Sequence, residues 1–269
     1  MARPQLSWTL DPGVLVLVVA LVALYVPRWR RVWGQEGARG ASLGRLACFA
    51  GGVLVILAAL VSPLDGLSDQ SFAAHMVQHV LLLDLAPILL ILSMTRVLLR
   101  PVTRRLSALE RQAGPLAHPV FAVVLYVLTI WAWHVPAAYD LALGNADVHA
   151  LEHISFTLAG SLYWWHVLSP IRSRARLQGL GVVGYMAVTK VLVGTLGIGL
   201  AFAGRAFYPF YVHRAHIWGL TAVTDQSVAG LIMAVEQSIV MGAALTVLFV
   251  RMLGESEAEQ RRRERYGLV

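Results

Sequence analysis

Long apolar runs separated by short polar segments make up most of this chain of 269 residues. A helix that crosses a bilayer needs about 20 mostly apolar residues. On that criterion the sequence predicts seven spans, at about residues 13–27, 45–62, 74–95, 118–134, 149–168, 179–203 and 227–250. The polar stretches between them are too short for a soluble domain. We therefore expect an all-α, seven-transmembrane-helix bundle, a single domain over 1–269 that ends in a charged tail, 251–269.

The composition agrees with insertion into a membrane. Hydrophobic residues make up 58% of the chain and charged residues 14%, whereas soluble domains have about 25% charged residues. The net charge of +7 does not indicate nucleic-acid binding, because the arginines lie beside the predicted spans, where they direct topology and contact anionic lipid. The single cysteine, Cys48, excludes an internal disulfide and a metal site built from several thiolates.

The arginines also predict the orientation of the chain. Lys and Arg in short loops are retained on the cytoplasmic side. All but Arg3, Arg205 and Arg214 follow the first, third and fifth predicted spans or lie in the tail. We therefore expect the N-terminus outside and the C-terminus in the cytoplasm. The first apolar run lacks the basic segment and cleavage site of a signal peptide, so we expect it to be retained as a span.

Five histidines occur at the ends of spans that this orientation puts outside. His75 and His79 open the third span at spacing i, i+4, His149 and His153 open the fifth span at the same spacing, and His134 closes the fourth. Two histidines at this spacing share one helix face and can reach one metal ion. We expect a shared metal site that uses two to four of the five; imidazole suits copper, zinc, iron and nickel.

Other side chains are candidates for a supporting role. Met76 and Met233 offer thioether ligands, although a methionine in a span more often serves packing. Asp84 and Glu236 lie inside predicted spans, where ionisable groups are costly, so they are candidates for support of the histidines or for a proton or cation path. Four further candidates lie near the outer surface: Glu152 beside His153, Asp225 at the mouth of the seventh span, and His213 and His216 in the loop before it.

Several of these residues stand in longer motifs between about residues 45 and 250. The motifs are His75-Met-Val-Gln-His79 with Leu81, Leu82 and Pro87; Trp133-His134-Val-Pro-Ala with Tyr139; His149-Ala-Leu-Glu-His153 with Ser155 and Phe156; Trp164-Trp165; and Asp225-Gln226 with Ala229-Gly-Leu-Ile-Met233. In this order they resemble the CtaG family of bacterial cytochrome c oxidase assembly factors. The resemblance implies a seven-helix protein of the bacterial plasma membrane that handles copper for a haem-copper oxidase.

On this resemblance we expect a copper-binding assembly factor that is not an enzyme. Copper ions that arrive from the outer face, supplied by an extracytoplasmic copper chaperone, would bind the histidines and pass to a haem-copper oxidase subunit. One alternative is an intramembrane zinc metallohydrolase that uses His149-x-x-Glu152-His153, with Glu152 activating a zinc-bound water. A di-haem electron carrier is less consistent with histidines at one depth. The sequence allows an oligomer and leaves the copper oxidation state and the number of ions open.

Overall fold

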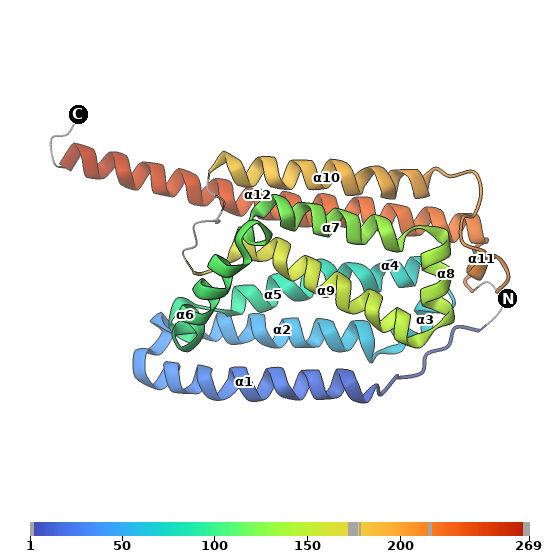
Figure 1. Cartoon of the computed structure of the whole chain (residues 1–269), viewed down its shortest axis with the longest axis horizontal. Helices are drawn as coiled ribbons and strands as arrows, with labels where there is room; N and C mark the ends of the chain where they lie inside the picture. The colour runs from blue at the N-terminus through green and yellow to red at the C-terminus, as the bar shows by residue number, and fades with distance from the viewer. Residues whose placement is uncertain (1–2, 172–176, 178, 215–216, 266–269) are drawn as a thin grey trace.

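All regular structure is helical in the part of the chain that the computed structural model describes, residues 3–171, 177, 179–214 and 217–265 (Figure 1). The long helices are α1 (Pro12–Glu36), α2 (Leu43–Leu60), α6 (Arg96–Ala113), α7 (Pro119–Trp133), α9 (Ala146–Leu168), α10 (Leu180–Ala201) and α12 (Ala222–Arg265). A further long helical run consists of α4 (Phe72–Val80), the π-helical turn η2 (Leu81–Leu85) and α5 (Ala86–Ser93). The short elements are η1 (Gly37–Arg39), α3 (Pro63–Ser68), η3 (Gly114–Ala117), α8 (Pro136–Gly144) and α11 (Pro209–Val212).

Each of the seven predicted spans coincides with a helix or a continuous helical run. Five helical stretches are long and apolar enough to cross a bilayer, and a sixth results if α6 with η3 and α7, which are bent by 66°, form one span. Within the described residues α9 does not reach this apolarity, because it carries acidic residues and histidines. The all-helical, membrane-type architecture is confirmed, whereas the number of seven spans and their orientation stay predictions.

The two ends of the bundle differ in chemistry. Figure 1 shows α6 and the C-terminal part of α12 at one end, and α3, α8 and α11 at the other. Many arginines lie in α6 and in the last turns of α12, so they gather at the first of these ends. Arg172, Arg174 and Arg176, on which the predicted orientation also depended, lie outside the described residues. One end of the bundle is therefore rich in arginine, and the predicted orientation puts this end on the cytoplasmic side.

Glycines allow the central helices to approach closely. A Cβ on Gly160 of α9 would overlap the carbonyl oxygen of Leu83 in η2, and a Cβ on Gly230 of α12 would overlap the backbone of Gly197 and Ala201 in α10. Small residues at such crossings let helix backbones touch inside a membrane. As a result α9 lies directly against the α4–η2–α5 run (Figure 1), and the polar faces of α4 and α9 meet.

Candidate metal centre

Three histidines and one glutamate converge where α4 meets α9. Each of His75, His79, Glu152 and His153 offers a ligand atom, and these atoms all lie within 4.8 Å of one another. His75 Nε2 is 3.7 Å from Glu152 Oε2, and His79 Nε2 is 3.5 Å from Glu152 Oε1. Two ligands bound at about 2.0–2.1 Å to one tetrahedral ion are about 3.4 Å apart. The observed separations are close to those of a metal site.

The polar atoms of this four-residue group are buried without hydrogen-bond partners. His75 and Glu152 are fully buried, and His79 and His153 are 4% and 8% exposed. Partners are missing for both ring nitrogens of His75 and His79, both carboxylate oxygens of Glu152, and Nε2 of His153. A buried polar group without a partner costs about 1–3 kcal/mol. These residues therefore fit a metal cation, which would pair with several of these atoms at once.

His149 lies beside this group. Its ring stacks on His75 with the centroids 5.2 Å apart, and its centroid is 4.2 Å from that of His153. Its Nε2 is also buried without a partner. Tyr139 of α8 packs against His75 from another side, with the centroids 5.1 Å apart, and burial raises the pKa of its phenol well above the usual range. The neutral phenol of Tyr139 therefore packs over the four-residue group on the side of His75.

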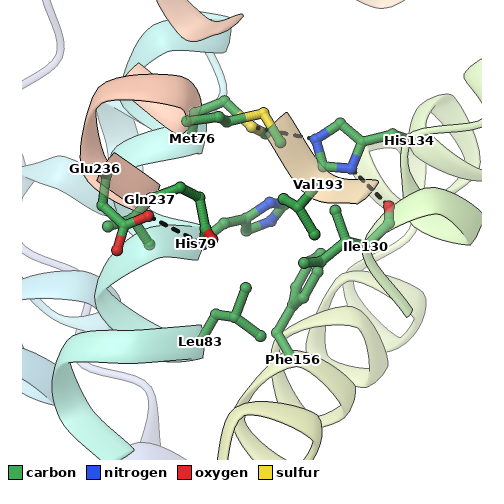
Figure 2. A pocket seen from close by; sticks show the side chains of 11 residues that line it. Met76, His79, Leu83, Ile130, His134, Phe156, Val193, Glu236 and Gln237 are labelled. Carbon is green, nitrogen blue, oxygen red and sulfur yellow. Dashed lines mark hydrogen bonds between the residues drawn. The ribbon is translucent and has the colours of Figure 1, made fainter. Parts of the chain in front are cut away.

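His134 faces a small cavity next to the group. This residue ends α7, and Figure 2 shows its ring between Met76 and the backbone of Ile130. Its Nδ1 lies 2.7 Å from the Ile130 carbonyl oxygen and its Nε2 lies 3.3 Å from Met76 Sδ. The ring centroids of His79 and His134 are 6.4 Å apart. The structure thus places His134 near the four residues, with its free nitrogen directed at a sulfur atom.

Asp225 holds the start of α4, and among the described residues its carboxylate bonds to no histidine. Its carboxylate accepts hydrogen bonds from the backbone N–H of Phe72 at 2.7 Å, from that of Ala73 at 3.1 Å and from Ser71 Oγ at 2.8 Å. The first N–H groups of a helix have no partner within the helix, and an anion at this end is favourable. Asp225 therefore positions the first turn of α4, which immediately precedes His75.

Asp84 and Glu236 belong to a second polar group farther along the helices. Asp84 accepts hydrogen bonds from the Tyr126 hydroxyl at 2.9 Å, Trp164 Nε1 at 2.6 Å and Gln237 Nε2 at 3.2 Å. Gln237 Nε2 also donates to Glu236 Oε2 at 3.3 Å. The suggested role of Asp84 and Glu236 in support of the histidines or in a proton or cation path stays a prediction. Their neutral partners Tyr126 and Gln237 were missed, because tyrosine and glutamine in a span carry no comparable signal.

Two of the three remaining sequence candidates are described by the structure, and neither belongs to the four-residue group. His213 is exposed in the turn after α11. His216 lies outside the described residues. Met233 of α12 is buried and lines the cavity beside His134 and His79.

Comparison with known proteins gives one family and three related proteins. The model of the family described as cytochrome c oxidase caa3 assembly factor (Caa3_CtaG) matches residues 23–255. The chain is 23% identical over 246 residues to the uncharacterized protein ML1998 of Mycobacterium leprae, and 24% identical over 250 residues to the uncharacterized proteins Mb0105 of Mycobacterium bovis and MT0111 of Mycobacterium tuberculosis. These matches cover 84% to 85% of this chain but 36% to 37% of the relatives, so the chain spans about a third of their length. No solved structure matches.

Proposed function

This chain belongs to the family of cytochrome c oxidase caa3 assembly factors, and on that premise we propose that it binds copper and delivers it to a haem-copper oxidase subunit. The observation that supports copper handling is the group of His75, His79, Glu152 and His153, whose ligand atoms lie within 4.8 Å of one another. Copper is the cargo of this protein in the proposal. The protein holds the ion and releases it, without catalytic turnover.

The donor set of this group suits divalent copper. Imidazole nitrogen and carboxylate oxygen both bind first-row divalent ions, and among these ions the affinity is highest for Cu²⁺. Glu152 supplies a negative charge inside the bundle, which compensates part of the charge of a buried cation. The imidazoles must be neutral to bind, so a fall in pH releases the metal.

We propose that the protein lies in the bacterial plasma membrane with seven spans, α9 among them. The N-terminus is outside and the group lies near the outer surface, where an extracytoplasmic copper chaperone can load it. The oxidase subunit receives the ion on the same side. Five or six helical stretches with span-like length and apolarity support the membrane location.

The position of Glu152 favours this function over zinc hydrolysis. In a hydrolase, Glu152 would activate a water on a zinc ion held by His149 and His153. In this structure its two carboxylate oxygens face His79 and His75 of α4, at 3.5 Å and 3.7 Å. That geometry supports a role for Glu152 as a ligand or counter-charge.

Metal content of the purified protein tests the proposal. The protein is loaded with copper in detergent, freed of excess metal and analysed by mass spectrometry, together with His79→Ala, His153→Ala and the exposed-histidine control His213→Ala. We expect bound copper in the wild type and the control, less copper in both site variants, and a copper-deficient oxidase in cells that carry them. Copper content unaffected by either site variant, or zinc bound in place of copper, would contradict the proposal.

A further inference from the structure

The contact between His134 and Met76 joins two electron-pair donors (Figure 2). His134 Nδ1 lies 2.7 Å from the Ile130 carbonyl oxygen. A carbonyl oxygen only accepts hydrogen bonds, so the ring proton is on Nδ1 and the neutral ring has a lone pair on Nε2. That nitrogen is 3.3 Å from Met76 Sδ, and a thioether has no proton to donate. Neither atom therefore satisfies the other by a hydrogen bond.

The separation of these two atoms matches a shared metal ion. Bonds of about 2.0 Å to nitrogen and 2.3 Å to sulfur place the two ligands of a tetrahedral ion about 3.5 Å apart. The observed 3.3 Å is slightly shorter, so a small movement of the flexible Met76 side chain would admit an ion. A ligand histidine usually donates its other ring N–H to a carbonyl or carboxylate group. The bond from His134 to Ile130 is of this kind.

The surroundings provide space and a further soft ligand. Met76 and His134 are 1% and 6% exposed, and the cavity beside them measures about 20 Å³, enough for about one water molecule or one ion. Met233 and His79 also line it. Glu236 lines the cavity as well, and Figure 2 shows it on the far side from His134. An ion here would be shielded from solvent.

We infer that His134, Met76 and Met233 form a second metal site, which takes copper(I). Thioether sulfur selects this soft ion, whereas the nitrogen and oxygen donors of the first group suit divalent copper. The inference rests on the proposed copper-handling function and assigns the two oxidation states of copper to two neighbouring sites. His79 connects them, because it belongs to the four-residue group and also lines the cavity.

Silver(I) and zinc(II) distinguish the two sites, because silver(I) is a soft monovalent analogue of copper(I) and zinc(II) prefers the imidazole and carboxylate donors. Both ions are titrated into the purified full-length protein in detergent. The test variants are Met76→Leu and His134→Gln. Met186→Leu is the matched control, because Met186 is fully buried in α10 and does not line the cavity, and a Met-to-Leu exchange nearly conserves volume.

We expect the wild type and Met186→Leu to bind silver(I) and zinc(II) together. Met76→Leu and His134→Gln should each lose silver(I) affinity by at least about tenfold, or 1.4 kcal/mol, with zinc(II) affinity unchanged. Equal silver(I) affinity in the wild type and Met76→Leu, or displacement of silver(I) by zinc(II), would overturn the inference. If Met76→Leu is unstable, the silver(I) affinity of His134→Gln is compared with that of the wild type instead, provided that the Tm of this variant is unchanged. Equal affinity would again overturn the inference. Silver(I) binding that depends on Met76, without zinc(II) binding, would instead contradict the four-residue site and support the second one.

Discussion

The substitution Glu152→Gln removes the negative charge of the four-residue group and keeps the side-chain volume. Glu152 is fully buried, and its oxygens lie 3.5 Å from His79 Nε2 and 3.7 Å from His75 Nε2. A divalent ion bound between these residues would lie within bonding distance of the carboxylate. We therefore expect zinc(II) and copper(II) to bind the variant much more weakly than the wild type.

Coulomb's law gives the magnitude of this loss. Even at 4 Å, farther than a metal–oxygen bond, two unit charges interact by about 4 kcal/mol at an effective dielectric constant of 20, and a divalent ion doubles that value to about 8 kcal/mol. The Gln amide oxygen remains available as a neutral ligand and recovers part of the interaction. A remaining loss of about 3–6 kcal/mol corresponds to a dissociation constant that is at least about 100-fold higher.

Competition against a chelator of known affinity measures the change at fixed neutral pH. The matched control is Asp140→Asn, since Asp140 lies in α8 at the same end of the bundle and accepts a hydrogen bond from the Phe210 N–H at 3.4 Å. We expect the control to bind zinc(II) like the wild type, because this partly exposed carboxylate is outside the four-residue group.

A zinc(II) affinity of Glu152→Gln within about threefold of the wild type, less than about 1 kcal/mol, would refute the role of Glu152 as a ligand or counter-charge. Retained metal with loss of function in cells would favour the zinc metallohydrolase.

Three other predictions concern the support of the site and its pH dependence. Gly160→Ala should lower Tm and zinc(II) affinity, since the added Cβ overlaps the Leu83 carbonyl oxygen and overpacking costs about 1–3 kcal/mol or more. The control is Gly184→Ala, where a Cβ meets nothing within 4 Å. Equal losses of Tm in the two variants would contradict the packing argument. Asp225→Asn should weaken zinc(II) binding indirectly, because the substitution loosens the first turn of α4. The rise in Tm on addition of zinc(II) measures this effect, and the same rise in the variant and the wild type would contradict the prediction. Metal affinity should fall as pH decreases, because the imidazole ligands must be neutral to bind and the bound state therefore carries fewer protons than the free state. Titrations at several pH values that give one constant affinity would exclude histidine ligation.

Local sequence was sufficient for the helices themselves. The apolar run predicted at 179–203 is helical as α10, Leu180–Ala201, and the run at 149–168 lies within α9, Ala146–Leu168. Hydrophobic content and signals for the start of a helix, such as the N-cap Asn145 of α9, depend on neighbouring residues only. The i, i+4 histidine pairs follow from the same local periodicity, and the family follows from short motifs in order along the chain.

Local sequence was a poor guide to helix ends and irregularities. The first run continues past Pro27 to Glu36, and the last continues to Arg265, because polar residues beyond the apolar segment remain compatible with a helix outside the bilayer. The π-helical turn at Leu81–Leu85 was not predicted. Its extra residue per turn changes the angle between His79 and Asp84, and the apolar periodicity around it carries no sign of this.

Only the tertiary structure decided which side chains form the candidate sites. Glu152 reaches His75 and His79 from another helix, His134 meets Met76 from 58 residues away, and Asp225 binds the start of α4 from more than 150 residues away. Helical periodicity determines which residues share a face, but the rotation and height of one helix against another depend on packing. Here that packing depends on contacts such as Gly160 against Leu83, which a single sequence does not pair.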